Sequence, residues 1–171
     1  MSGLVVWFTG LPSSGKTTLA RAVKNDLGVR GIACCVLDSD EVRSALHPPP
    51  DYDSDGRGAF YATLASLAAL LARQGIVVLV AATAHRKAYR AAAQIVAPRF
   101  VEVFVDTPLE ECERRDAKGL FRRGRAGEIT GVPGIHTAYE PPSSPAVVAR
   151  GGSNDEALAA VVSVILASRA A

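Results

Sequence analysis

Eight consecutive residues near the start of the chain match the pattern G-x-x-x-x-G-K-[ST], which is typical of a loop that binds nucleotide phosphates. They are Gly10, Leu11, Pro12, Ser13, Ser14, Gly15, Lys16 and Thr17, and Thr18 follows them. Glycines let the backbone curl so that its N–H groups bind phosphate oxygens at the positive end of the next helix. The Lys16 side chain is predicted to reach the β- and γ-phosphates of ATP, and the Thr17 hydroxyl to ligate Mg²⁺.

The loop alone predicts a bound nucleoside triphosphate and leaves the reaction open. A GTPase would carry a base-reading Asn/Thr-Lys-x-Asp sequence, which the chain lacks. A small-molecule kinase agrees better with a short chain and an arginine-rich late segment, because such a segment can cover the site and exclude water from ATP. Five arginines lie there: Arg114, Arg115, Arg122, Arg123 and Arg125. We expect at least one of them to contact ATP, and we assign Arg115 to the nucleotide; a solvated arginine-rich surface is the alternative.

Two carboxylates and an arginine follow the second apolar segment of the chain. Asp38, Asp40 and Arg43 come at the predicted carboxyl end of a strand, which is the edge where open α/β sheets bind ligands. The carboxylates could hold the water shell of Mg²⁺ and take the proton of an acceptor hydroxyl. Asp40 could also cap the helix that follows. Arg43 suits an anionic acceptor.

The elements that must position these residues alternate between strand and helix patterns. Short apolar runs predict strands at 4–8, 32–37, 76–81 and 100–106, with a further short strand near 146–149. Helical spacing of apolar residues predicts helices at 17–27, 40–46, 60–73, 85–96, 109–117 and 155–168. Residues 48–57 are turn-rich, and residues 118–144 have no sustained period. We therefore predict a three-layer α/β fold of the P-loop type, with a mainly parallel five-stranded sheet and helices on both faces.

The length predicts one domain over residues 1–171, in which residues 118–144 form a lid. The charge, 19 Lys and Arg against 17 Asp and Glu, gives a net +2 and does not indicate nucleic acid as a partner. No segment has a signal peptide's pattern or the length of a membrane span, and the three cysteines have no metal-like spacing. We expect a cytoplasmic protein that takes a small-molecule substrate and no membrane; a homodimer stays open.

Residues 100–121, with the sequence FVEVFVDTPLEECERRDAKGLF, resemble the adenylyl-sulfate kinases. Further family motifs occur in order: Gly-Leu-x-x-x-Gly-Lys-Thr-Thr at 10–18, Leu-Asp-x-Asp-x-x-Arg at 37–43 and Arg-x-Gly-Glu-Ile at 125–129. The resemblance covers residues 3–145. It implies a P-loop kinase that uses ATP and Mg²⁺ to phosphorylate the 3′-hydroxyl of adenosine 5′-phosphosulfate.

The resemblance also implies roles for single residues. Lys16 would act in catalysis, Asp40 corresponds to the proposed base, and Asp38 to its partner near the metal. The residues that it places against the acceptor, besides Asp40, are Arg43, Tyr52, Arg57, Phe60, Lys118, Leu120 and Val132. Arg43 and Arg57 would hold the phosphosulfate, and Tyr52 would pack on the adenine.

The acceptor side departs from the family pattern at several positions. After Arg57, the chain lacks the family's Asn and its pair of arginines. It also lacks the family's Ile-Ser-Pro-Tyr segment and the second aromatic residue of the family's adenine clamp. The residues found there are Phe60, Ala62, Thr63, Thr83, Ala84, His85, Arg86 and Val132. His85, Arg86, Lys87 and Arg90 could replace lost charge, although a solvated helix start explains them better. A kinase for another small-molecule hydroxyl therefore stays open. A non-catalytic nucleotide-binding domain is disfavoured by the intact phosphate loop.

Overall fold

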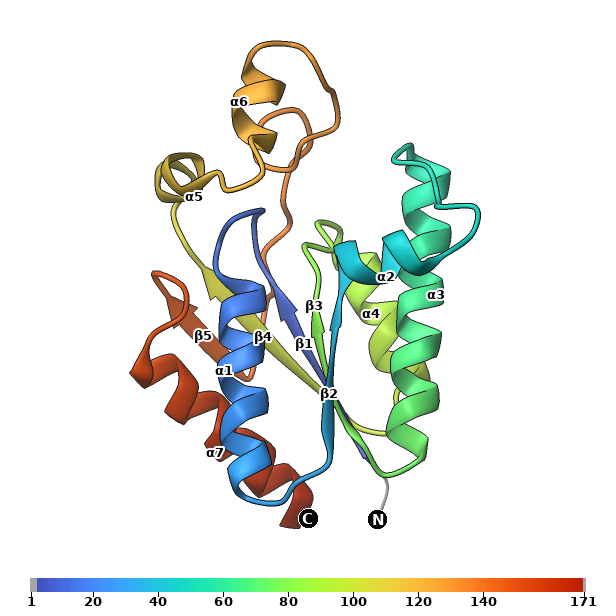
Figure 1. The fold of residues 1–171 in the computed structure, drawn as a ribbon, viewed down its shortest axis with the longest axis vertical. Coiled ribbons are helices and arrows are strands. Elements are labelled where there is room, and N and C mark those ends of the chain that lie inside the picture. The colour runs from blue at the N-terminus through green and yellow to red at the C-terminus, as the bar shows by residue number, and fades with distance from the viewer. Residues whose placement is uncertain (1–2, 171) are drawn as a thin grey trace.

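The computed structural model describes residues 3–170, and its centre is a five-stranded sheet in the order β2-β3-β1-β4-β5 (Figure 1). The strands are β1 (Leu4–Thr9), β2 (Cys34–Asp38), β3 (Val77–Ala81), β4 (Phe100–Asp106) and β5 (Val147–Arg150). Every neighbouring pair is parallel. The parallel five-stranded sheet predicted from the sequence is confirmed, and all of its strands end at the same edge.

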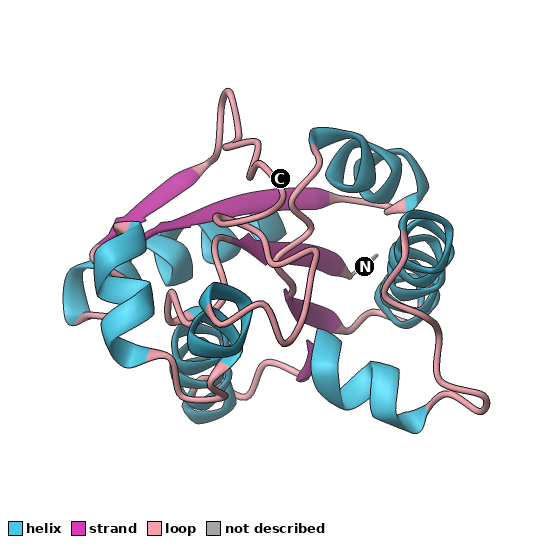
Figure 2. Cartoon of the chain, turned by 90° about the horizontal axis from the view of Figure 1, so that it is seen from above, coloured by secondary structure: helices cyan, strands magenta, loops and turns pink. Residues whose placement is uncertain are grey.

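Helices cover both faces of the sheet (Figures 1 and 2). Helices α1 (Lys16–Val29) and α7 (Asp155–Ala170) lie on one face, and α3 (Ser54–Arg73) and α4 (Lys87–Val96) on the other. Three short helices lie toward the carboxyl edge of the strands: α2 (Ser39–Ala45), α5 (Leu109–Arg115) and α6 (Leu120–Arg125). No helix within residues 3–170 is both long enough and apolar enough to cross a membrane.

Strand β1 explains why the sheet is sandwiched in this way. All six of its residues are buried, as expected for a parallel strand covered on both sides. Leu4, Val6 and Phe8 pack in the core beneath α1 and α7, whereas Val5 and Trp7 pack beneath α3 and α4. The period of two along the strand thus divides its side chains between two apolar cores.

Two elements differ from the sequence-based prediction. Helix α3 begins at Ser54 instead of residue 60, because the carboxylate of Asp53 accepts a hydrogen bond from the backbone N–H of Gly56 (2.7 Å) and caps it. The predicted lid contains helix α6, whose first N–H groups are capped by the Asp116 carboxylate. The lid also has a small core of its own, formed around Cys112, Phe121 and Val132.

Candidate active site

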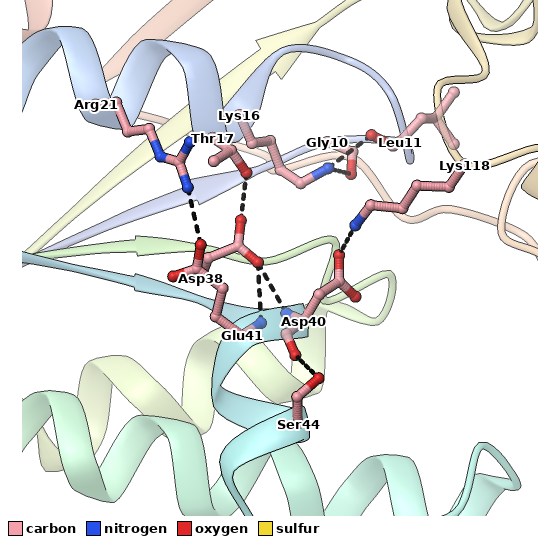
Figure 3. Close-up of polar contacts among 10 residues, drawn as sticks. All are labelled: Gly10, Leu11, Lys16, Thr17, Arg21, Asp38, Asp40, Glu41, Ser44 and Lys118. Atoms are coloured by element: carbon pink, nitrogen blue, oxygen red, sulfur yellow. Dashed lines mark hydrogen bonds and ion pairs between the residues drawn. The ribbon is translucent and has the colours of Figure 1, made fainter.

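The phosphate loop joins β1 to α1 and carries Lys16 at the first turn of that helix. Gly15 adopts a left-handed conformation (φ 103°), which favours glycine and lets α1 begin abruptly. Thr107 holds the loop from outside by donating a hydrogen bond to the Ser14 carbonyl (2.8 Å). The Lys16 ammonium donates to the carbonyls of Gly10 (3.1 Å) and Leu11 (2.7 Å), so the lysine folds back over its own loop (Figure 3).

The environment of Lys16 makes its charge sensitive to pH. Burial lowers the pKa of the ammonium to about 8, although the nearby carboxylates Asp40 and Asp38 act in the opposite direction. The protonated form attracts phosphates and the neutral form does not. Bound phosphates must therefore raise this pKa, and binding must weaken as the free lysine loses its proton.

We expect the affinity for a non-hydrolysable ATP analogue to be constant up to pH 8 and to fall about tenfold per pH unit above it. Calorimetric titration on either side of pH 8 measures this dependence. The Lys16→Met variant should bind weakly with a flat profile. A flat profile for the unaltered protein would contradict the prediction.

Asp38 connects the phosphate loop to α2. Its Oδ2 accepts a hydrogen bond from the Thr17 hydroxyl (2.5 Å), and its Oδ1 accepts from the backbone N–H groups of Asp40 (2.9 Å) and Glu41 (3.3 Å) (Figure 3). Asp38 is therefore the N-cap of α2, and the interpretation of Asp40 as that cap is wrong. Because Asp38 caps α2 and is buried, its carboxylate is fixed beside the Thr17 hydroxyl.

These two oxygens suit a magnesium ion that arrives with a nucleotide. Mg²⁺ is usually held by one or two protein oxygens together with substrate phosphates. In the part of the chain that the structure describes, no cluster of three or more His, Cys, Asp or Glu side chains could hold a metal alone. Thr17 and Asp38 thus fit a Mg²⁺ site in which the phosphates of a bound nucleotide supply the other ligands.

Asp40 lies across the cleft from the lid. Its carboxylate forms an ion pair with the Lys118 ammonium (Figure 3), and both side chains are more than half exposed. Burial by itself lowers the pKa of Lys118, but the hydrogen bond and the charge of Asp40 outweigh it and raise that pKa above its usual value. This contact joins the start of the lid to the carboxyl edge of β2.

Arg43 forms the centre of the acceptor-side wall. Its guanidinium lies between two rings, 4.2 Å from the Tyr52 centroid and 4.0 Å from that of Phe60. It also donates to the carbonyls of Pro50 (2.9 Å) and Asp51 (3.3 Å). A buried cation held by two rings is oriented before any ligand binds.

The lid closes the opposite side of this wall. Arg57 of α3 donates to the carbonyl of Gly131 (2.8 Å) in the lid. Leu120 and Val132 also line the cleft, but the Val132 side chain is only 1% exposed and packs in the lid core. Its methyl group Cγ2 lies 3.0 Å from where a Cβ of Gly124 would stand, so Val132 packs closely on the backbone of α6.

Arg115 lies at the nucleotide end of the cleft. It donates to the carbonyls of Ser14 (3.4 Å) and Gly151 (3.1 Å), and so connects the phosphate loop to the turn after β5. Arg125 pairs with Glu113 (2.7 Å) and Arg114 pairs with Glu111. Of the five late arginines, Arg115 and Arg123 line the cleft.

A single cleft of about 810 Å³ brings nearly all of the predicted site residues together. Gly10 and Leu11 are the exceptions: Gly10 is buried, and Leu11 borders a second cavity under the lid. Six cationic side chains and two carboxylates face the cleft: Lys16, Arg43, Arg57, Arg115, Lys118 and Arg123, with Asp38 and Asp40. This excess of positive charge suits two anionic ligands side by side.

Tyr61, Thr83, His85 and Arg123 also line the cleft, although the sequence assigned none of them individually to a ligand; Arg123 was one of five candidate arginines. His85 is only 3% exposed, so its assignment to a solvated helix start is wrong, as it is for Arg90. The usable signal was position: Thr83 and His85 follow β3, whose carboxyl end shares an edge with the ends of β1 and β2.

The family model described as adenylylsulphate kinase matches residues 2–150. The chain belongs to the adenylylsulphate kinase family. The adenylyl-sulfate kinase of Synechococcus sp. (strain JA-2-3B'a(2-13)) is 43% identical over 148 residues, which are 86% of this chain and 85% of that one. That of Enterobacter sp. (strain 638) is 43% identical over 150 residues, covering 85% and 73%. The resemblance recognised in the sequence is thereby confirmed.

A solved adenylylsulphate kinase has the same fold over almost its whole length. The APS kinase CysC of Mycobacterium tuberculosis, in complex with AMPPNP and APS, superposes with a TM-score of 0.88 at 36% identity, and the match covers 99% of both chains. A sugar kinase from Janibacter sp. HTCC2649, at 18% identity and a TM-score of 0.61, shares the fold alone.

In this member of the adenylylsulphate kinase family, Arg90 ties the end of the lid to the loop after β3. The buried guanidinium pairs with Glu102 (2.7 Å) and donates to the carbonyls of Ala84 (2.5 Å) and Glu140 (2.6 Å). The Lys87 N–H donates to the Glu140 carboxylate (2.7 Å). The lid therefore returns to the sheet through a network centred on the buried Arg90 guanidinium.

Removing the Arg90 guanidinium should destabilise the protein strongly. The Arg90→Met variant leaves a carboxylate and two carbonyls without their donor, which costs about 3–5 kcal/mol of the free energy of unfolding. Urea denaturation measures this loss. Arg86→Met, an exposed change in the same region, is the control and should stay within about 0.5 kcal/mol. Equal effects of the two substitutions would contradict the network's role.

Proposed function

We propose that the protein transfers the γ-phosphoryl group of ATP to the 3′-hydroxyl of adenylyl sulfate, giving 3′-phosphoadenylyl sulfate and ADP. The observation that carries the proposal is the single cleft, which has the phosphate loop at one end, a cationic and aromatic wall at the other, and two carboxylates between them. Family membership and the AMPPNP and APS bound to the Mycobacterium tuberculosis relative support it.

At the nucleotide end, the backbone N–H groups of residues 12–18 surround the phosphates of ATP, and Lys16 leaves its loop carbonyls to contact the β- and γ-phosphates. Arg115 lies where it can cover the remainder of the nucleotide. Each of these cations neutralises charge on the phosphates, and this favours departure of the ADP oxygen.

Thr17 and Asp38 would hold Mg²⁺ together with the phosphates. The ion supplies charge neutralisation at the β- and γ-oxygens. Asp38 keeps its position because α2 is capped by the same carboxylate.

At the acceptor end, Asp40 accepts the proton of the attacking 3′-hydroxyl as the new O–P bond forms. Arg43 and Arg57 bind the phosphosulfate, and Tyr52 packs on the adenine. Lys118 leaves Asp40 and contacts the acceptor, so that closure of the lid and release of the base occur together. The closed lid excludes water, which would otherwise consume ATP.

The purified protein, ATP and Mg²⁺ test this proposal when each of two acceptors is added in turn. Adenylyl sulfate should give ADP and 3′-phosphoadenylyl sulfate in equal amounts, separated by ion-exchange chromatography. Adenosine 5′-phosphate, which lacks the sulfate, should react far more slowly. Absence of product with adenylyl sulfate would overturn the proposal.

A second candidate is a kinase of the same build for another small anionic hydroxyl compound. The observation that favours it is the aromatic wall formed by Phe60, Tyr61 and His85, in which Phe60 and His85 depart from the family pattern. ATP consumption with a panel of nucleotides and phosphorylated metabolites distinguishes the two candidates, because only the first predicts adenylyl sulfate as the preferred acceptor.

We also propose that the protein is cytoplasmic. Its three cysteines form no disulfide within residues 3–170, which agrees with a reducing compartment. Light scattering would show whether the protein is the homodimer that the sequence leaves open.

A further inference from the structure

His85 faces the cleft from the loop between β3 and α4. This loop follows the carboxyl end of β3, at the sheet edge where α2 also begins (Figure 1). The side chain lines the cleft and the residue is 97% buried, with only 3% of its surface exposed. Neither ring nitrogen hydrogen-bonds to any residue that the structure describes. The imidazole therefore borders a ligand cavity, and its nitrogens have no hydrogen-bond partner among the described residues.

The backbone beneath this ring is held rigidly. The Ala84 N–H donates to the Tyr61 hydroxyl (3.0 Å), the Ala84 carbonyl accepts from Arg90 (2.5 Å), and the His85 carbonyl accepts from the Glu140 N–H (2.8 Å). Ala84 also has φ 39°, a conformation that is uncommon for residues other than glycine. Three separate elements thus fix the loop, as a preorganised binding group requires.

Aromatic neighbours fix the ring itself. Tyr89 contacts the imidazole edge-on at a centroid distance of 5.5 Å, and Tyr61 stacks on Tyr89 at 4.7 Å. Phe60 continues the cluster, with its centroid 5.5 Å from that of Tyr61. Because the Arg43 guanidinium lies over the Phe60 ring, the cluster connects His85 to the cationic part of the wall.

The charges around His85 favour the neutral imidazole. Burial and the nearby guanidinium groups of Arg57, Arg86 and Arg90 lower its pKa, and the Glu140 carboxylate only partly opposes them. The uncharged Tyr89 ring also faces the imidazole. A neutral imidazole carries one N–H donor. Beside the cationic wall, that donor suits an anionic oxygen of a ligand.

We propose that His85 is a specificity-determining residue that donates a hydrogen bond from its imidazole to an oxygen of the acceptor's phosphosulfate. The inference rests on the proposed function, because it needs an anionic acceptor at this end of the cleft. The family motifs assign no ligand contact to this position, so the His85 hydrogen bond is additional to theirs. Arg57 contributes positive charge beside the same phosphosulfate, and His85 contributes a directional hydrogen bond.

Steady-state kinetics with four variants tests this contact. His85→Phe keeps an aromatic ring against Tyr89 but removes both nitrogens. It should raise the KM for adenylyl sulfate about 10- to 100-fold and leave that for ATP within about twofold. His85→Asn and His85→Gln each restore an N–H donor, and one of them should recover most of the loss. Tyr89→Phe, which keeps the ring contact, is the matched control and should change neither KM.

A second measurement follows the imidazole in the unaltered protein and uses a variant only to assign its resonance. Nuclear magnetic resonance follows the titration of the His85 ring, identified among three histidines by its loss in His85→Phe. Adenylyl sulfate, added with a non-hydrolysable ATP analogue, should raise the pKa of His85, because an anion on its N–H stabilises the cationic ring. The ATP analogue alone should leave that pKa unchanged.

The outcomes separate this inference from the function on which it rests. No turnover of adenylyl sulfate by the unaltered protein would overturn both. Normal turnover, with His85→Phe leaving the KM for adenylyl sulfate unchanged, or with no shift in the His85 titration on acceptor binding, would overturn the role of His85 alone.

Discussion

Replacement of Lys16 by alanine is expected to lower kcat by at least about 10²–10³-fold. The ammonium is the cation that the phosphate loop places nearest to the transferring phosphoryl group, and alanine leaves the charge developed there without its partner. The fold should tolerate the change, because Lys16 donates only to two carbonyls of its own loop. Burial also lowers the pKa of its ammonium, so the charge itself does not stabilise the folded protein. Turnover at saturating substrates and thermal melting give the two measurements.

Lys24→Ala is the matched control for this variant, because Lys24 lies exposed on the same helix, α1. It should retain the kcat of the unaltered protein. A Lys16→Ala protein with kcat within about threefold of normal would show that the loop does not act on the γ-phosphate.

The Asp40→Asn variant is expected to lose about 10²–10⁴-fold in kcat while it binds ATP normally. The amide keeps the shape of the side chain and cannot accept the hydroxyl proton. The affinity for ATP should be unaffected, because the residues expected to contact Mg²⁺ and the phosphates are Thr17 and Asp38. These two side chains hydrogen-bond to each other, and the Asp40 carboxylate takes no part in that bond. Single-turnover kinetics and calorimetric titration of a non-hydrolysable ATP analogue separate the two effects.

Two further variants define the cause of that loss. Glu41→Gln changes the neighbouring carboxylate of α2, which pairs with Arg21 on the surface, and should leave kcat unchanged. Lys118→Met removes the ion-pair partner of Asp40 without removing the proton acceptor, so it should raise the KM for the acceptor more than it lowers kcat. If Asp40→Asn weakens ATP binding and keeps kcat at saturation, Asp40 serves nucleotide binding and not proton transfer.

The sequence was informative about the nucleotide half of the site because local chemistry dictates that half. The loop at 10–17 needs its glycines and lysine at fixed spacing, whatever surrounds it. The strands at its flanks are continuous apolar runs, which predict parallel strands buried on both faces. Strand β4 was predicted with its observed bounds, Phe100–Asp106, and the others within two residues at each end.

Helix ends and caps depended on contacts that spacing does not specify. Asp38 and Asp40 are both good capping residues, and only the backbone geometry selects Asp38. Likewise the Asp53 cap extends α3 through a segment whose turn-forming residues predicted a loop. Such choices between neighbouring polar residues differ by about 1 kcal/mol, which tertiary packing easily overrides.

By itself, the sequence determined the sheet, the phosphate loop and the pair of carboxylates, since each arises from residues close together in the chain. The family resemblance named Arg43, Phe60 and Lys118 for the acceptor wall, but only the tertiary structure showed how these distant segments meet and added His85. Arg43 comes from α2, Phe60 from α3, His85 from the loop after β3, and Lys118 from the lid. A histidine before a charged helix start has the pattern of a solvated residue. It lines a binding cleft here because Tyr61 and Arg90 bind the backbone of the preceding Ala84, and Glu140 binds the backbone of the histidine itself.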